Sequence, residues 1–322
     1  DDFYVLEDNC RTPSGVSYML ENREIMMKMF PDLFHSNRVL RVDDYPTRLL
    51  QTLMSLAPKK CDSSVPTVVL LTPGHLNSAY YEHTFLSDQM GIEMVEAQDL
   101  FVENDFLYMK TVDGPKKIDV VYRRIDDDYL DPLAYNPNSV IGVPGITHVY
   151  KTGGVNICSA PGAGIADDKA VYIYVPEMIK FYLGETPILD NVQTWRCERD
   201  DDLKYVLENI DELVIKEVDG SGGHGMLIGP KSTKQEIEDF SSKLKLHPEG
   251  YIAQPTLDLS SSPTLIDNEI SGRRVDLRPF CLLGEKVQLC PGGLTRVALG
   301  KGSYVVNSSQ GGGVKDTWVL AD

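Results

Sequence analysis

The segment at residues 214–226, VIKEVDGSGGHGM, combines a lysine with a glycine-rich loop. Its apolar start predicts a strand that carries Lys216, and we expect a second strand, not a helix, after the loop. Glycines let backbone N–H groups approach a phosphate closely, and consecutive N–H groups form a concave anion site. The loop residues that could do this are Gly220, Ser221, Gly222 and Gly223. The pattern predicts a phosphate-binding loop assisted by Lys216, with an ordinary glycine-rich hairpin as the alternative.

Charged residues also recur on predicted strands nearer the C-terminus. Asp276 and Arg278 are two residues apart, so both side chains point to the same face of their strand. A single charged pair on a strand is usually exposed to solvent, and that alternative stays open for these two. Arg296 and Asn307, on two further predicted strands, add polar groups to the same region. Together the four residues favour a site.

The N-terminus carries a carboxylate and an amide at alternate positions, Glu7 and Asn9. On the strand that we expect here, both side chains share one face. Carboxylate and amide oxygens are ligands that Mg²⁺ accepts, and Mg²⁺ usually takes few protein ligands together with substrate phosphates. Arg11 and the turn at residues 13–15 follow directly. From these residues alone, the end of an ordinary strand explains the segment equally well.

Two weaker signals lie between these segments. Lys169 follows two aspartates at the start of a predicted helix. Acidic residues are favoured at a helix N-terminus by the macrodipole, and from the residues alone that explanation is preferred. Gln254 lies on the predicted strand at 251–257, where its amide could contact the edge of an adenine.

The predicted elements separate into two kinds along the chain. Helices are expected at 17–30, ending before Pro31, and from Asp44 onward. Strand–helix–strand spacing between residues 67 and 97 predicts a parallel sheet. From about residue 192 the chain favours antiparallel strands, with a hairpin turn at Gly284-Glu285. The later strands are expected at 251–257, 273–283, 286–292, 295–299 and 303–307, and a helix at 232–246.

Composition narrows the class of protein. The chain has 322 residues and a formal net charge of −17, which opposes binding to a nucleic-acid backbone. Its six cysteines show no metal-binding spacing, a pattern typical of reduced thiols in the cytoplasm. An acidic N-terminus and the lack of any long apolar run argue against a signal peptide and a membrane span. These features predict a soluble cytoplasmic protein.

Taken together, the motifs resemble those of the ATP-grasp enzymes along essentially the whole chain. The segments PGGLTRVAL, VVNSSQGGG and KDTWVL are similar to those of the circularly permuted members. In other members the Glu-x-Asn strand comes last, whereas here it comes first. The resemblance implies a mixed α+β and α/β fold: a circularly permuted ATP-grasp domain with an inserted pre-ATP-grasp α/β domain. The implied parts are residues 1–60 (displaced metal-binding strand and helices), 61–165 (pre-ATP-grasp domain) and 166–322 (nucleotide-binding subdomains).

The same resemblance implies roles for the residues above. Lys169, Lys216, the loop at 220–223, Gln254 and Asp276 would bind ATP, and Glu7 and Asn9 would bind Mg²⁺. Arg278, Arg296 and Asn307 would act on the transferred phosphoryl group, and Arg11, Ser14 and Gly15 would contact the carboxylate substrate.

The implied activity is an ADP-forming ligase that activates a carboxylate as an acylphosphate for attack by an amine, giving a peptide-like amide bond. Both substrates would be small molecules or peptides. A glutathionylspermidine-synthetase-like ligase, a phosphotransferase and a non-catalytic ATP-binding partner stay open as alternatives. Two departures from the family pattern stand out. An Asp expected upstream of Glu7 is missing, which predicts a fragment lacking one strand, and Arg274 stands where relatives often have His.

Overall fold

The computed structural model describes residues 3–220, 225–300, 302–303, 306 and 311–321. The chain forms two compact units. Unit 1 contains residues 1–10 and 163–260, and unit 2 contains residues 11–162 and 261–322. The chain therefore passes from one unit to the other at three places. The division at residues 60 and 165 stays a prediction.

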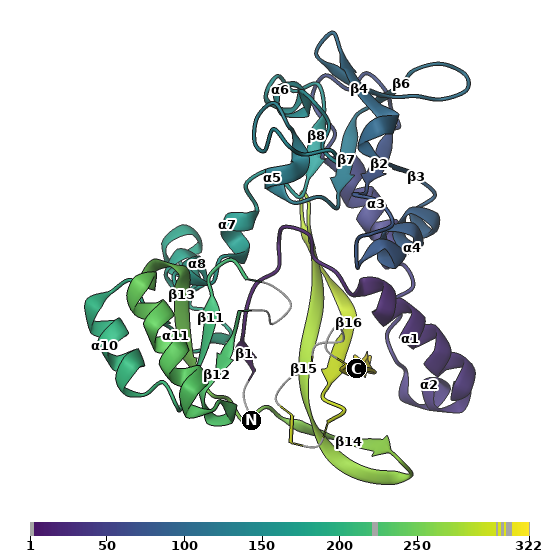
Figure 1. The fold of residues 1–322 in the computed structure, drawn as a ribbon. Coiled ribbons are helices and arrows are strands. Elements are labelled where there is room, and N and C mark those ends of the chain that lie inside the picture. Colours follow the sequence, from purple (N-terminus) through teal and green to yellow (C-terminus); the bar gives the residue numbers. More distant parts are fainter. Residues whose placement is uncertain (1–2, 221–224, 301, 304–305, 307–310, 322) are drawn as a thin grey trace. The chain divides into compact units, whose positions relative to one another are not determined.

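Unit 1 is built on a four-stranded antiparallel sheet in the order β10-β13-β11-β12. The predicted strand–loop–strand around the glycines is confirmed, because β11 and β12 pair with Ile215 opposite Leu227. Two helices, α10 and α11, lie against this sheet (Figure 1), and Val206 and Leu244 from them join its core. The bounds are β10 Trp195–Arg196, α10 Asp200–Glu208, β11 Leu213–Glu217, β12 Leu227–Ile228, α11 Lys234–Leu246 and β13 Tyr251–Pro255.

The N-terminal strand β1 also belongs to unit 1, where it pairs in parallel with β9. Strand β9 is only two residues long, so β1 pairs over Tyr4–Val5 and ends there. The expectation that Glu7 and Asn9 lie on a strand is therefore wrong, because both follow its end. The other elements of this part are α7 Gly164–Asp167, α8 Lys169–Tyr172, α9 Val175–Met178, the π-helix η2 Ile179–Leu183 and β9 Asp190–Asn191, with short 3-10 turns η3 Gly229–Lys231 and η4 Pro248–Gly250.

Unit 2 contains the expected parallel sheet, in the order β3-β2-β7-β8. Its central strands β2 and β7 are buried along their whole length, which explains the apolar sequence of β2 and the apolar start of β7. A small antiparallel sheet, β4-β5-β6, shares the same core. The bounds are α3 Tyr45–Ser55, β2 Val68–Leu71, α4 Tyr80–Met90, β3 Glu93–Val95, η1 Ala97–Asp99, β4 Leu100–Glu103, β5 Phe106–Met109, β6 Lys116–Ile118, β7 Val120–Arg123, α5 Asp127–Leu130, α6 Ile146–Lys151 and β8 Asn156–Cys158.

A second, antiparallel sheet of unit 2 follows the order β14-β15-β16-β17. The hairpin expected at Gly284-Glu285 is confirmed, with Leu283 paired to Val287. Two separate strands were expected at 286–292 and 295–299, but β16 is continuous because Gly292 and Gly293 keep pairing with β17. The bounds are β14 Ser261–Ile266, β15 Glu269–Leu283, β16 Val287–Val297 and β17 Gly313–Trp318.

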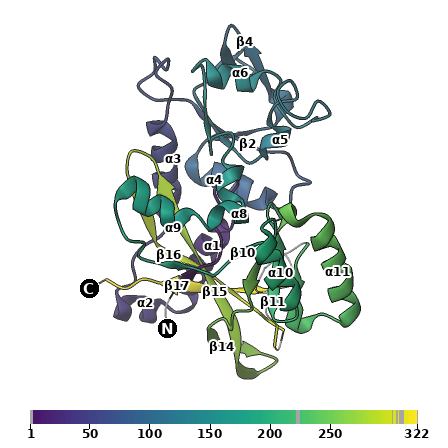
Figure 2. The same ribbon diagram turned by 90° about the vertical axis from the view of Figure 1, so that its left-hand side faces the viewer.

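Helix α1, Val16–Met29, packs against this sheet (Figure 2), and Met19 and Leu20 from it join Leu294 in one core. The helix ends before Pro31 as expected. Pro31 then begins a further helix, α2 Pro31–Asn37, because proline is well suited to the first helical position. In the part of the chain that the structure describes, no helix is long and apolar enough to span a membrane.

Candidate functional site

The amine of Lys216 is held inside unit 1 by a glutamine on the neighbouring strand. Lys216 on β11 donates from Nζ to Oε1 of Gln254 on β13 at 2.7 Å. Gln254 is 4% exposed, and its Nε2 donates to Oγ1 of Thr194 at 3.0 Å. Both ends of the amide are therefore engaged, and Gln254 orients the lysine. The expected adenine contact of Gln254 stays a prediction.

The surroundings of Lys216 lower the pKa of its ammonium group. Burial lowers the pKa of the Lys216 ammonium and Lys169 lowers it further, whereas Glu7 acts in the opposite direction. A buried ammonium gains most from an anion that can approach it, because the local dielectric is low. Lys216 is thus suited to binding a phosphate group.

Lys169 connects helix α8 to the start of the glycine loop. Asp168 caps the helix by accepting from the backbone N–H of Ala170 at 2.7 Å, as expected for an acidic helix N-terminus. The backbone N–H of Lys169 donates to the Val218 carbonyl at 3.0 Å, and its Nζ donates to the Gly220 carbonyl at 2.6 Å. The helix start therefore fixes the entry to the loop. The loop residues Ser221, Gly222 and Gly223 lie outside the described residues.

The segment after β1 carries two carboxylates, Glu7 and Asp8, and Glu7 interacts electrostatically with Lys216. Glu7 and Asn9 are exposed, whereas Asp8 is half-buried. Burial raises the pKa of the Asp8 carboxyl, and the negative charges of Asp167 and Glu7 raise it further. This excess of negative charge is the environment that a cation relieves.

The donor atoms fit magnesium better than a metal held by protein alone. Among the described residues, no three His, Cys, Asp or Glu side chains come together as a metal site. The Glu7 carboxylate and the Asn9 amide oxygen are hard ligands, and Mg²⁺ commonly takes only one or two such groups with phosphates and water. A magnesium ion bound with ATP therefore fits these residues.

In unit 2, the charged residues on β15 contact groups on other segments. The Asp276 carboxylate lies opposite Arg296 in the β15–β16 register and forms a two-point ion pair with it. Arg296 Nε donates to Asp276 Oδ1 at 2.8 Å, and Nη2 donates to Oδ2. Arg278, which shares a face with Asp276, donates instead to the Ser14 carbonyl at 2.8 Å. Cross-strand register decided the partner, and Asn307 lies outside the described residues.

The turn at Ser14 and Gly15 is shaped by its surroundings within unit 2. Gly15 has a φ of 111°, a left-handed conformation that residues with a side chain rarely adopt. A Cβ added there would lie 3.2 Å from Cδ2 of Leu294. Arg11, just before the turn, forms an ion pair from Nε to Oδ1 of Asp126 at 3.3 Å. The structure thus places the predicted substrate residues on one ordered segment that also contacts Arg278.

Two buried residues that the sequence analysis missed hold this turn. Glu82 on α4 accepts at Oε2 from the backbone N–H of Gly15 at 2.7 Å, and from the N–H and hydroxyl of Ser17 at 3.1 and 2.8 Å. Arg124, directly after β7, donates to the Pro13 carbonyl at 2.7 Å and to the Ser14 hydroxyl. Glu82 and Arg124 also pair with each other at 3.3 Å, with side chains 2% and 1% exposed.

A signal for Arg124 existed in the sequence. Arg124 follows the carboxyl end of a predicted parallel strand, where ligand-binding groups of α/β sheets gather. Glu82 offered no comparable signal, because a glutamate in a helix is usually exposed.

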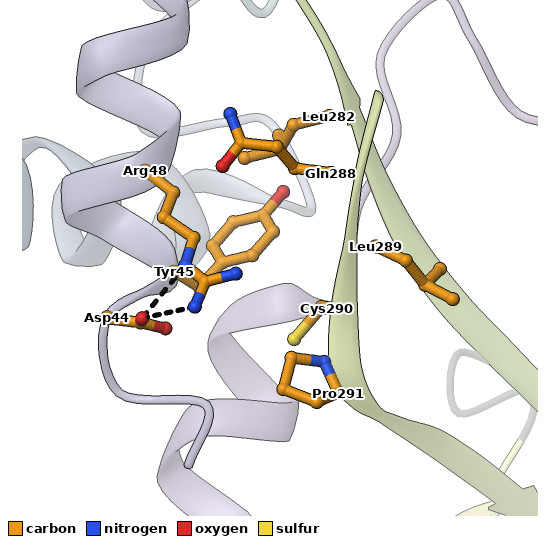
Figure 3. Close-up of a pocket in the computed structure, with 8 residues that line it drawn as sticks. All are labelled: Asp44, Tyr45, Arg48, Leu282, Gln288, Leu289, Cys290 and Pro291. Atoms are coloured by element: carbon orange, nitrogen blue, oxygen red, sulfur yellow. Dashed lines mark hydrogen bonds and ion pairs between the residues drawn. The ribbon is translucent and has the colours of Figure 1, made fainter. Parts of the chain in front are cut away.

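A small hollow elsewhere in unit 2 is lined by α3 and the β15–β16 hairpin (Figure 3). Its volume of about 10 Å³ is close to the room that one water molecule needs. Asp44 and Arg48 form an ion pair at its edge at 2.6 Å. None of the predicted site residues lines this hollow, so it is no substrate pocket.

His83, next to Glu82, should make the stability of the protein sensitive to acid. It is 1% exposed, its Nδ1 lies 2.9 Å from the Thr72 hydroxyl, and burial, then Arg124, lowers its pKa to about 3. An unfolded histidine has a pKa of about 6.5, so between these values only the unfolded chain binds the proton. Stability should therefore fall as the pH falls from 6.5 towards 3.

The substitution His83→Gln removes this proton uptake. Urea unfolding at pH 4 to 7 should show a pH dependence of the unfolding free energy that is shallower by up to about 1.4 kcal/mol per pH unit. His35→Gln, at an exposed position of α2, is the control and should leave the slope unchanged. A parent slope retained in His83→Gln would contradict the assignment.

Known proteins are similar to this chain over most of its length. A family model described as circularly permuted ATP-grasp type 2 matches residues 1–298. An uncharacterized protein of Synechocystis sp. is 54% identical over 319 residues, covering 99% of this chain and 66% of its own length. An uncharacterized protein of Mycobacterium tuberculosis is 53% identical over 322 residues, covering 99% of this chain and 58% of its own. The chain thus spans about six-tenths of the length of these relatives.

More distant similarities carry more informative names. A protein of Frankia casuarinae, provisionally named glutamate–cysteine ligase 2-2, is 40% identical over 318 residues, covering 98% of this chain and 36% of its own length. Among solved structures, a glutathione synthetase-like effector from Globodera pallida matches with a TM-score of 0.61 at 11% identity, covering 98% of this chain and 70% of its own. At that identity the match shows a shared fold.

Proposed function

The chain belongs to the circularly permuted ATP-grasp type 2 family, and from this premise we propose that it is an ADP-forming carboxylate–amine ligase. Such an enzyme transfers the γ-phosphoryl group of ATP to a carboxylate. An amine then displaces phosphate and forms a peptide-like amide bond. The proposed substrates are small molecules or peptides. The names of the Frankia and Globodera proteins, a ligase and a synthetase-like protein, support this class of reaction.

The observation that carries the proposal is the pair of positioned amines in unit 1. Gln254 holds the Lys216 amine at 2.7 Å, and the Lys169 amine contacts the Gly220 carbonyl at 2.6 Å. In the proposed role both ammonium groups bind ATP phosphates. Ordered donors of this kind need little rearrangement when charge develops, which is how phosphoryl-transfer enzymes stabilise the transition state.

Metal binding is assigned to the segment that follows β1. The Glu7 carboxylate and the Asn9 amide would hold magnesium, which supplies charge neutralisation of the phosphates. The negative charge beside Asp8 is consistent with this role. Glu7 also attracts the Lys216 ammonium, so it favours the charged form that a phosphate requires.

Unit 2 supplies the groups proposed to act on the transferred phosphoryl group and the carboxylate. Arg278 and Arg296 would stabilise negative charge, for which the planar guanidinium is well suited. Asp276 orients Arg296 through its two-point contact. The turn at Ser14 and Gly15 would receive the carboxylate. The cytoplasm, where all six cysteines would stay the free thiols found here, is the proposed location.

Calorimetric titration of Mg·ATP into the parent chain and two variants tests the proposal. Lys216→Ala removes a charged donor, and charged hydrogen bonds contribute about 1.5–3 kcal/mol, so we expect roughly 10- to 100-fold weaker binding. Glu7→Gln should weaken Mg·ATP binding more strongly than metal-free ATP binding. Lys245→Ala, on the exposed end of α11, serves as the matched control and should bind like the parent.

Binding that both variants weaken and the control retains would support the assignment. It would justify a screen of carboxylates and amines for ADP release. Equal affinity in the parent and Lys216→Ala would contradict the role of the lysine.

A further inference from the structure

The hydroxyl of Tyr172 joins three separate segments of unit 1. Tyr172 ends helix α8 and is 2% exposed. Its hydroxyl donates to the carbonyl of Val5 on β1 and accepts from the backbone N–H of Val192, after β9, at 2.7 Å. Asn191 on β9 also contacts Tyr172, because its Nδ2 donates to the Tyr172 carbonyl at 3.0 Å. One buried side chain thus anchors the end of β1.

Residues just before Tyr172 also hold Cys10, at the far end of the segment that carries Glu7 and Asn9. The backbone N–H of Cys10 donates to the carboxylate of Asp167, the last residue of α7. Residues 6–9 therefore run between two fixed points, Val5 and Cys10, both held by residues 167–172. Glu7 and Asn9 lie in the middle of this span.

Lys169 is fixed by the same short helix. It precedes Tyr172 by three residues, and its own contacts with Val218 and Gly220 hold the glycine-loop entry at 3.0 and 2.6 Å. Residues 167–172 thus set the distance between a phosphate-binding amine and the Glu7–Asn9 span.

We propose that Tyr172 is a positioning residue whose hydroxyl sets the metal-binding geometry of Glu7 and Asn9. The inference rests on the proposed function, because it takes these two residues as the magnesium ligands. In this role Tyr172 acts through the backbone of Val5, to which its hydroxyl donates. Besides the short pairing of β1 with β9, the backbone N–H of Val192 also donates to the Val5 carbonyl at 3.3 Å, and the Tyr172 hydroxyl is the side-chain donor to that carbonyl.

The chemistry of the hydroxyl suits this role. Burial raises the pKa of Tyr172 to about 12, so the phenol stays protonated and able to donate at physiological pH. Phenylalanine keeps the ring and its packing but loses both hydrogen bonds of the hydroxyl, and only the longer direct contact from the Val192 N–H to the Val5 carbonyl, at 3.3 Å, then joins these two residues. The substitution Tyr172→Phe therefore separates the hydroxyl from the volume of the side chain.

The test compares ATP binding by calorimetry in excess Mg²⁺ and in EDTA. The ratio of the two dissociation constants is the metal-dependent gain in affinity. We expect this gain to fall about tenfold in Tyr172→Phe, equivalent to about 1.4 kcal/mol, while the affinity for metal-free ATP stays unchanged. A merely structural role would weaken both affinities together.

Tyr174→Phe is the matched control. Tyr174 lies two residues after Tyr172. Its hydroxyl accepts from Arg196 at 2.6 Å and from Arg199 at 2.9 Å, so Tyr174→Phe removes these two contacts and leaves those of β1 in place. Its gain should equal that of the parent. If Tyr172→Phe does not fold, Asn191→Ala replaces it, since it loosens α8 from β9 and should reduce the same gain.

The outcomes separate the two proposals. A parent chain without any metal-dependent gain would overturn the proposed metal site itself. A gain that Glu7→Gln abolishes but Tyr172→Phe retains would overturn the positioning role and leave the proposed function intact. A reduced gain in Tyr172→Phe with a normal gain in Tyr174→Phe would support the inference.

Discussion

Replacing Arg278 by alanine should reduce ADP formation by about 10³-fold or more while the affinity for Mg·ATP changes little. Arginines that stabilise a transferred phosphoryl group contribute about 10³–10⁵ in rate, because the charge that they meet develops in the transition state. Arg278 is fixed by its 2.8 Å contact with the Ser14 carbonyl. Its guanidinium is thus positioned before any substrate arrives.

A coupled enzyme assay of ADP release measures the rate of Arg278→Ala against that of the parent chain. The assay uses the carboxylate–amine pair on which the parent chain is most active. Mg·ATP binding is measured in parallel. Arg273→Ala is the control, since Arg273 lies on the same strand and contacts the Leu299 carbonyl at 3.1 Å at the surface. Arg278→Lys should remain strongly impaired, because an ammonium cannot reproduce the planar fork. Parallel losses of binding and turnover would remove the assigned role.

Replacing Glu82 by alanine should lower the free energy of unfolding by about 3–5 kcal/mol. The substitution leaves Arg124 as a buried charge without its carboxylate and also removes the acceptor for Gly15 and Ser17. Buried ion pairs contribute little relative to apolar pairs, but breaking one by removing a single partner is costly. Urea denaturation of unit 2, followed with a local probe, measures the effect.

A double-mutant cycle identifies the source of that loss. Combining Glu82→Ala with Arg124→Met removes both charges, so the second substitution should cost much less in the double variant than alone. Glu93→Ala is the control, because its ion pair with Lys116 is about half exposed and contributes at most about 1 kcal/mol. Additive losses at Glu82 and Arg124 would show that the two side chains are not coupled.

The fold was largely predictable where burial dictates the sequence pattern. Strand β2 is a continuous apolar run and β7 begins with one because both strands are buried, and the parallel sheet follows from the spacing of strands and helices. Strand β16 was divided in the prediction because Pro291, Gly292 and Gly293 are typical of turns. The pairing with β17 overrides that local preference.

The site was less predictable, because its contacts depend on register and on long separations along the chain. The sequence places Asp276 and Arg278 on one face but cannot set which residue of β16 lies opposite Asp276. Glu82 lies 67 residues from Gly15, and in the sequence a glutamate within a helix looks like one that is exposed to solvent. Lys216, by contrast, was identifiable because a strand lysine before clustered glycines is a local pattern.

Three hydrogen bonds converge on one oxygen of Glu82, and because of them hydrogen exchange can report on the segment after Arg11. The amides of Gly15 and Ser17 point at a buried carboxylate rather than at water. Their protons should exchange with deuterium only when this part of unit 2 opens, so their exchange rates measure how often the turn is released. Ligands that bind to the turn should slow the exchange of these two amide protons. Measuring the exchange rates with candidate carboxylates therefore tests which of them binds, before any product is known.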